Sequence, residues 1–164
     1  MADNSLVFPQ HIHMNDFDGN FKAYFLAVYE IFLDCFVRKG CAYHGTKVTA
    51  QKHPEVDGIH RTFYHITHEG EDEQNRIPDL ERMARIRYPH FVITSCPHDE
   101  LLVWEKTVGR DERIHILNEA ESYIVVLTKR RGYLLFWTAF YIQQKHTMRK
   151  KKKEYEAYIN ANTA

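Results

Sequence analysis

The chain has 164 residues, 44% of them hydrophobic and 27% charged, and its formal net charge is zero. These values predict one soluble globular domain over residues 1–164 and exclude a protein that is basic along its whole length, so only local patches could attract nucleic acid. The three cysteines are an odd number without a C-x-x-C spacing, which predicts reduced thiols in a cytoplasmic protein. No signal-peptide pattern opens the sequence, and the longest apolar run, near residues 133–142, is too short to cross a membrane as a helix.

An N-terminal helix is predicted over residues 18–40. Its apolar residues recur at three- and four-residue steps, at Phe21, Tyr24, Phe25, Val28, Phe32, Cys35 and Phe36. This spacing is typical of an amphipathic helix, and Gly40 stands where a left-handed C-terminal cap is expected. Residues 41–58 are predicted to be a connector, because Pro54 and Asp57-Gly58 are turn signals.

The segment from Ile59 to Thr67 is predicted to be a strand. In a strand, Phe63, His65 and Thr67 would share one face. His60 would lie on the opposite face from His65, so only one of the two imidazoles would face a cleft.

A short arginine-rich helix is predicted from Pro78 to Arg87, because Pro78 is placed like the first residue of a helix and Pro89 like a stop signal. Its core face would be formed by Leu80, Met83 and Ala84. Arg82 and Arg85 would lie on the other side of the helix.

The rest of the chain is predicted to be mainly β, with strands over residues 90–94, 101–108, 113–117, 123–128 and 133–142. Lys129–Gly132 would be a hairpin connection, and the tail, residues 143–164, would carry a basic helix from 143 to 159. This order predicts an α+β fold. It would have an N-terminal helix packed on a curved antiparallel sheet, an arginine-rich helix after the first strand and a basic C-terminal helix.

Three sequence words occur in one order along the chain: FYHIT-x-EG, R-x-PDLERMARIRY and YIVVL-x-KR-x-GYLLFWTAF. In this order they resemble the phage-associated nucleases grouped with barnase, EndoU, colicin D and RelE. The resemblance covers a core over residues 59–142, and residues 21–36 match the family's N-terminal helix. It implies a small α+β fold with a curved antiparallel sheet and metal-independent cleavage of RNA, often of tRNA by toxins.

The resemblance also implies site residues. His65 matches the family's strand histidine, and Thr138 matches the threonine of its last strand, which is commonly written T-A-Y. The charged helix segment of the family is matched by Arg76, Asp79, Arg82 and Arg85. At the tyrosine position this chain has Phe140, and Tyr141 would lie on the opposite face of a regular strand. Unless a bulge re-aims Tyr141, the site would lack a phenolic hydroxyl.

These residue types suit RNA cleavage in which the 2′-OH of the RNA is the nucleophile. An imidazole with an ordinary pKa of about 6.5 can move a proton, and a guanidinium can stabilise the charge that grows on the phosphorane. We therefore expect His65 to be the general acid or base, Arg82 or Arg85 to hold the phosphate, and Thr138 to orient it. Further substrate contacts are expected from His60 (also a second acid or base candidate), Arg76, Arg87, Arg130, Tyr141, Arg149 and Lys150.

Each of these features also has a purely structural interpretation. A histidine within an apolar strand is more often packed or simply exposed, and the arginine-rich helix can be a solvated face with surface ion pairs. The basic run Arg149–Lys153 is more often a solvated helix end than an RNA contact. Tyr155 and Tyr158 beside it can stack on bases or dock the tail on the sheet.

No cofactor and no metal are expected. His11-x-His13 and Cys96-Pro97-His98-Asp99 do not complete a four-ligand set by spacing, and no H-E-x-x-H occurs. The sequence also has no Walker A, G-x-G-x-x-G or G-x-S-x-G pattern, which disfavours a nucleotide-cofactor enzyme, an ATPase and a serine hydrolase.

Three hypotheses follow. The first is a metal-independent endoribonuclease from a toxin-like or mobile-element setting, with tRNA as a candidate target and an immunity or antitoxin protein as a candidate partner. The second is a non-catalytic module on the same fold that binds RNA or a protein, which Phe140 favours. The third is a small structural protein that forms a homodimer through an aromatic surface.

Overall fold

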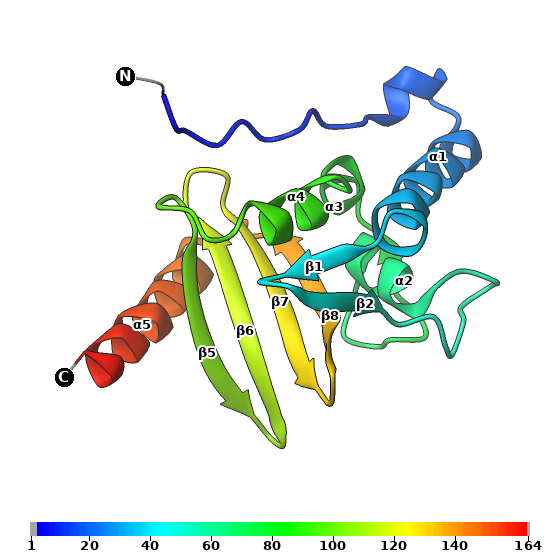
Figure 1. Ribbon diagram of the computed structural model, residues 1–164. Coiled ribbons are helices and arrows are strands. Elements are labelled where there is room, and N and C mark those ends of the chain that lie inside the picture. The colour runs from blue at the N-terminus through cyan, green and yellow to red at the C-terminus, as the bar shows by residue number, and fades with distance from the viewer. Residues whose placement is uncertain (1–2, 164) are drawn as a thin grey trace.

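The computed structural model describes residues 3–163 and has the α+β fold that the sequence predicts (Figure 1). A six-stranded sheet has the order β1-β2-β8-β7-β6-β5, and all neighbouring strands are antiparallel except β2 and β8, which are parallel. These strands are β1 (Cys41–Tyr43), β2 (Thr46–Ala50), β5 (Leu102–Val108), β6 (Asp111–Asn118), β7 (Tyr123–Arg130) and β8 (Tyr133–Tyr141). A separate ribbon pairs β3 (His68–Glu69) with β4 (Ile77–Pro78).

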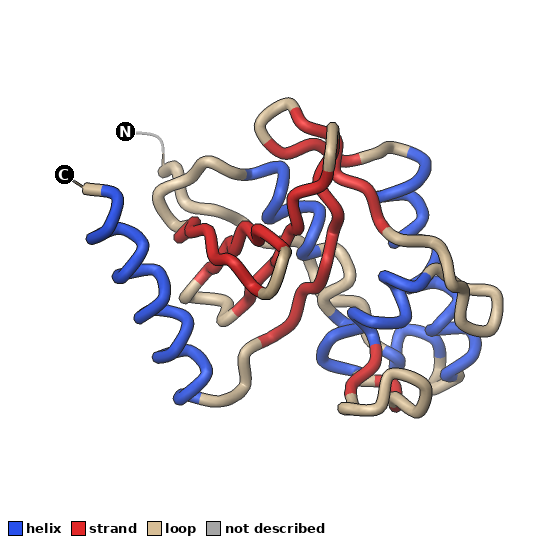
Figure 2. Tube along the Cα trace, turned by 90° about the horizontal axis from the view of Figure 1, so that it is seen from below, coloured by secondary structure: helices blue, strands red, loops and turns tan. Residues whose placement is uncertain are grey.

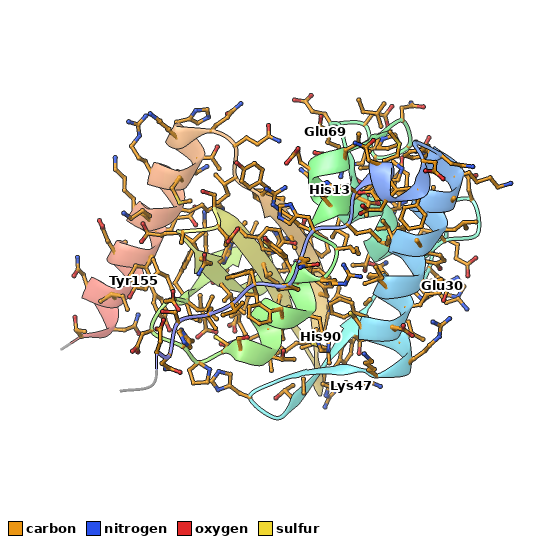
Figure 3. The ribbon with its side chains drawn as sticks, turned by 90° about the horizontal axis from the view of Figure 1, so that it is seen from above. His13, Glu30, Lys47, Glu69, His90 and Tyr155 are labelled. Carbon is orange, nitrogen blue, oxygen red and sulfur yellow. The ribbon has the colours of Figure 1, made fainter. Side chains whose placement is uncertain are left out.

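The helices cover the two faces of the sheet unequally. They are a 3₁₀ helix (Met14–Phe17), α1 (Phe21–Leu33) with a π-helical continuation (Asp34–Arg38), α2 (Arg61–Thr67), α3 (Leu80–Ala84), α4 (Tyr88–Ser95) and α5 (Lys145–Asn162). Helices α1 to α4 contribute to one large core, whereas α5 packs on the other face of the sheet, away from these helices (Figure 2). The N-terminal segment runs over α3 and α4 (Figure 3) and is held there by the bond from Ile12 N to the Ala84 carbonyl (3.0 Å).

The predicted N-terminal helix is confirmed. It begins after Asn20, whose side chain accepts a hydrogen bond from the Ala23 amide at 3.1 Å. Tyr24, Val28 and Phe32 of its apolar stripe are buried, the last two completely. Gly40 follows with a φ of +80°, as expected for a left-handed C-terminal cap.

The predicted strand over residues 59–67 is wrong, because Arg61–Thr67 forms helix α2. Phe63 is fully buried against three rings of α1, those of Phe25, Tyr29 and Phe32, at centroid distances of 5.5, 4.7 and 5.3 Å. Aromatic and β-branched residues favour strands only where a pleated surface is available to receive them. Here packing against α1 overrides that preference.

The chain after this point also differs from the prediction. The expected helix over residues 78–87 is shortened to α3, because Pro78 belongs to β4. The expected strand over residues 90–94 is part of α4, in which Pro89 lies in the first turn and does not end the preceding helix. The position of Pro89 suits a proline, since the amide groups of a first helical turn have no partner within the helix.

The predicted connector, residues 41–58, contains the two strands β1 and β2. Val48 of β2 is fully buried and pairs with Leu134 of β8, which is distant in the sequence. A three-residue and a five-residue strand carry too little periodicity to be predicted, so this edge of the sheet was missed. The four strands that follow α4 and the C-terminal helix were predicted correctly, apart from their ends.

The sheet has one face toward the main core and another toward α5. Alternating residues of the central strands face the main core, for example Ile116, Val125, Leu134 and Phe136. The other face includes Trp104, Leu117, Ile124 and Val126, on which Tyr155 and Tyr158 of α5 pack. Docking of the tail on the sheet is therefore one role of these tyrosines.

A β-bulge interrupts β8 at Trp137. Val126 of β7 pairs with Thr138 and the next residue, Leu127, pairs with Phe136, so Trp137 is the extra residue. Thr138 therefore lies on the same face as Val126, toward α5. The bulge precedes Phe140 and Tyr141, which pack on opposite faces of the sheet, so it does not bring Tyr141 to the position of Phe140.

Helix α3 depends on a side-chain cap. The Asp79 carboxylate accepts hydrogen bonds from the Glu81 amide at 2.9 Å and the Arg82 amide at 3.2 Å. We expect Asp79→Ala to lower the free energy of unfolding by about 1 kcal/mol, measured by urea denaturation. Asp79→Asn keeps a side-chain oxygen as acceptor, so its free energy of unfolding should fall by less. An equal loss in both variants would mean that the ion pair with Arg82, not the cap, is the stabilising contact.

Candidate functional site

A hollow of about 870 Å³ lies where α2 meets the β2–β8 edge of the sheet. Basic side chains line it from several elements: Lys47 of β2, Arg61 and His65 of α2, and Arg130 of β7. The Lys47 end is labelled in Figure 3. Tyr133 and Trp137 of β8 add aromatic surface. This volume is in the range of pockets that enclose a small organic ligand.

The local structure explains why these side chains meet. Arg61 and His65 are four residues apart in α2 and therefore lie on one face of the helix, while Phe63 faces the core. Lys47 lies beside Val48 in β2 and points to the opposite face of the sheet from that buried residue. Arg130 and Tyr133 pair across the hairpin between β7 and β8, so both reach the same end of the hollow.

Glu73 is the one acidic residue among the described residues that line the hollow, and it sits among cations. Its Oε1 accepts a hydrogen bond from His65 Nδ1 at 3.2 Å and lies 3.9 Å from an Arg61 nitrogen. Its Oε2 lies 3.1 Å from Arg76 Nε. A carboxylate can only accept, so this contact fixes the proton on Nδ1 and leaves His65 Nε2 as the basic nitrogen.

The surroundings of His65 keep its imidazole neutral near pH 7. Burial lowers its pKa below 6.5, and the positive charges of Arg76 and Arg82 act in the same direction. The contact with Glu73 opposes this shift by stabilising the imidazolium. A neutral imidazole with a free Nε2 is suited to accept a proton from a substrate.

A second group of charges lies beside the hollow, around Trp137. The Arg113 guanidinium lies over the indole of Trp137, 4.6 Å from the ring centroid. The His65 ring lies 6.5 Å from the same indole, tilted by 49°. Asp111 holds Arg113 at 3.4 Å and Arg130 at 3.2 Å, so one carboxylate fixes two guanidiniums.

Neither Arg82 nor Arg85, of which one was predicted to hold the phosphate, lines the hollow. Arg85 is only 8% exposed; it bonds Glu81 at 2.8 Å and lies 4.0 Å above the ring of Tyr141, on the main-core side. This contact places Arg85 and Tyr141 together, away from the residues that line the hollow. Arg82 bonds Asp79 and lies 5.6 Å from the centroid of the Phe140 ring.

Arg76 is a structural residue as well as a neighbour of Glu73. Its guanidinium donates to the carbonyl groups of His65 and His68, both at 3.1 Å. These bonds fasten the loop that carries Glu73 to the end of α2. Arg76 thereby positions the dyad of His65 and Glu73 without lining the hollow itself.

Several other predicted site residues lie elsewhere. His60 hydrogen bonds with the Tyr29 hydroxyl at 2.8 Å and is outside the hollow, and Arg87 donates to the Gln10 carbonyl at 3.3 Å. Arg149 and Lys150 are exposed on α5. Thr138 is partly exposed next to Trp137 on the α5 face of the sheet and does not line the hollow. Of the eleven predicted residues, His65 and Arg130 are therefore the two in its wall.

The partners of His65 could not be predicted from the sequence. Arg61 was detectable only if the segment was taken as a helix, in which it precedes His65 by one turn. Glu73 stood in an acidic turn without a signal of its own, and Lys47 fell in the predicted connector. Trp137 adjoins Thr138 in the sequence, but its placement depends on the bulge.

One histidine of each segment considered as a metal site, His11-x-His13 and Cys96-Pro97-His98-Asp99, is engaged in another contact. His11 hydrogen bonds with the Tyr88 hydroxyl at 2.9 Å, and His98 Nε2 donates to the Asn4 carbonyl at 2.7 Å. Within residues 3–163, no three His, Cys, Asp or Glu side chains are grouped as metal ligands would be. In the same part of the chain, no helix combines the length and apolar character needed to cross a membrane.

Comparison with known proteins gives no relative: no family model, no curated protein and no solved structure matches this chain.

Proposed function

We propose that this protein is a metal-independent endoribonuclease and that the hollow beside α2 is its active site. The observation that carries the proposal is the dyad of His65 and Glu73, placed among guanidiniums in a hollow of about 870 Å³. A proton acceptor next to fixed positive charges is what transesterification at a phosphate requires. The resemblance to the phage-associated nucleases implies the same reaction, but His65 lies in a helix and not in a strand, and the matched Arg82, Arg85 and Thr138 do not line the hollow. A toxin-like setting, tRNA as target and an immunity partner rest on that resemblance.

The reaction would use the 2′-OH of the RNA as nucleophile. His65 Nε2 takes the proton of that hydroxyl while the 2′-oxygen bonds to the adjacent phosphorus. Arg61, Arg130 and Lys47 bind the nonbridging oxygens, whose charge grows in the transition state. The bond from phosphorus to the 5′-oxygen breaks, and that oxygen leaves with a proton from solvent. The products are a 2′,3′-cyclic phosphate and a 5′-hydroxyl.

The experiment that tests this proposal is cleavage of purified tRNA and total RNA in EDTA. Cyclic-phosphate ends that are lost in His65→Ala would support it. Intact RNA across several substrates would contradict it, and so would cleavage that persists unchanged in the variant.

Glu73 should control the pH dependence of the reaction. Its charge raises the pKa of His65 against the opposing effect of burial. Because protonated His65 cannot act as a base, activity should fall as pH decreases through that pKa. In Glu73→Gln this acidic limb should move to lower pH, and kcat should fall by about tenfold or more because the imidazole loses its orienting acceptor.

The matched control is Glu71→Gln, which neutralises an exposed carboxylate in the same loop. It should leave both kcat and the pH profile unchanged. An acidic limb that stays in place in Glu73→Gln would show that His65 is not the group that titrates.

A non-catalytic binding module is the second candidate. It is favoured by Phe140, which lies next to Arg82 where the nuclease family has a tyrosine hydroxyl. Salt-dependent RNA binding without product formation would select this alternative. If neutralising Arg149–Lys153 abolished that binding, the contact would lie on the exposed side of α5.

A further inference from the structure

We propose that the hollow takes an unpaired nucleotide whose base stacks on Trp137, so that the substrate is single-stranded RNA and not a duplex. This inference rests on the proposed function, because it names the substrate class of the same site. It arises from the aromatic surface of the hollow, which the chemistry of cleavage does not use.

Trp137 is half-buried at the margin of the core cluster that α5 covers and is not part of its buried centre. The bulge makes it the extra residue of β8, and its indole is partly exposed in the wall of the hollow. The second tryptophan of the chain provides the contrast: Trp104 is 1% exposed and covered by α5. An aromatic ring at the surface of a basic hollow is typical of proteins that stack on nucleic-acid bases.

The indole is held in place before any ligand binds. Arg113 lies 4.6 Å from the ring centroid and is itself fixed by Asp111. A guanidinium over an indole is a favourable cation–π contact, which stabilises the observed orientation of the ring. A platform that is already ordered loses little conformational entropy when a base stacks on it.

The phosphates on either side of such a base would meet positive charge. Lys47, Arg61 and Arg130 line the hollow around the aromatic surface. Glu73 is shared between Arg76 at 3.1 Å and Arg61 at 3.9 Å, and Asp111 is shared between Arg130 and Arg113, so positive charges around the hollow outnumber these two carboxylates. The hollow therefore combines a sequence-independent stacking surface with phosphate contacts, the two elements of single-strand recognition.

A duplex does not fit this arrangement. In a helix the bases stack on one another and present only their edges, so a ring in the wall of a hollow cannot reach the face of a base. The hollow is the size of a small-ligand pocket and would accept one nucleotide that has been turned out of a stack. Access to Trp137 therefore requires an unpaired residue.

The test is a binding titration that does not depend on cleavage. A ten-nucleotide 2′-O-methyl RNA has no free 2′-OH and cannot react, so it reports binding alone. Trp104→Phe in the full chain leaves Trp137 as the fluorophore. We expect the single strand to quench this emission and to bind at least tenfold more tightly than the same strand annealed to its complement.

Two further ligands and variants separate stacking from charge. An abasic strand of equal length keeps the phosphates and removes the bases. These variants lack the Trp137 fluorophore, so their binding is measured by fluorescence anisotropy of a dye-labelled strand. Trp137→Leu should weaken binding of the normal strand by about ten- to a hundredfold and leave binding of the abasic strand unchanged, while Trp137→Phe should restore most of the affinity. Thermal unfolding of each variant shows that it is folded.

Equal affinity for single strand and duplex would overturn the inference. An equal loss of affinity for the normal and the abasic strand in Trp137→Leu would also overturn it. The absence of nucleic-acid binding, with quenching by an acidic peptide instead, would also overturn it in favour of a protein partner. Binding as expected without cleavage of ordinary RNA would sink the proposed function and leave the inference standing. Cleavage of single-stranded and duplex RNA at equal rates would support the proposed function and overturn the inference about unpaired nucleotides.

Discussion

His65→Ala is expected to lower the rate of RNA cleavage by about 10²- to 10⁴-fold, the range that a positioned general acid or base supplies. His65 is the imidazole that lines the hollow, and its contact with Glu73 leaves Nε2 free to take a proton. The burial and the neighbouring arginines that lower its pKa keep it in the basic form near pH 7. Binding of the non-reactive 2′-O-methyl strand should change little, because the phosphate contacts come from other residues.

The measurement is single-turnover cleavage with enzyme in excess, so that product release does not limit the rate. His146→Ala provides the control, because His146 is an exposed histidine on α5. It should cleave at the rate of the unmodified protein. If His65→Ala retained the full rate while remaining folded, the assignment of the active site would be wrong.

The second large effect concerns stability. Phe63→Ala is expected to lower the free energy of unfolding by about 3–5 kcal/mol. Phe63 is fully buried and touches the rings of Tyr29 and Phe32 in α1, so its loss leaves a cavity between α1 and α2. Urea denaturation with a common m value measures the change.

The control is Phe21→Ala, which removes the same side chain in the first turn of α1. Phe21 is 39% exposed. That change should cost about 1 kcal/mol or less. A small effect in Phe63→Ala would mean that α2 is not anchored through this ring. Since α2 carries Arg61 and His65, the variant should also lose activity at temperatures where the unmodified protein is folded.

The sequence predicts those elements whose stability is local in origin. The periodicity of α1 and the strands from residue 101 to 142 was visible because each repeats its pattern over seven or more residues. The hairpin between β7 and β8 was visible because Gly132 supplies the positive φ that the turn requires. Element ends were less predictable, since hydrogen bonds and caps that depend on the fold decide them.

Where tertiary contacts decide the secondary structure, the prediction from the sequence is wrong. Residues 61–67 have the composition of a strand and become a helix because Phe63 fills a space beside α1. Residues 88–95 become α4 for a similar reason, with Val92 and Ile93 buried in the core.

The same distinction applies to the site. His65 could be predicted as a site residue from the chemistry of its imidazole. Its partners could not be predicted, because Lys47, Glu73 and Trp137 come from three separate parts of the chain and meet only in the fold. Arg82 and Arg85 looked equivalent in sequence, yet one lies beside Phe140 and the other is packed on Tyr141.

The parallel pairing of β2 with β8 has a consequence for synthesis of the protein. Residues 48–50 pair with residues 134–136, so β2 is paired with β1 alone until the end of the sheet has left the ribosome. Contacts between such distant segments are slow to form, because a long loop must close first. The wall of the hollow is therefore assembled late, and a nascent chain that stops before β8 lacks Trp137 as well as the docking site of β2. If the protein cleaves RNA as proposed, an unfinished chain would be inert toward the RNA that surrounds it during translation.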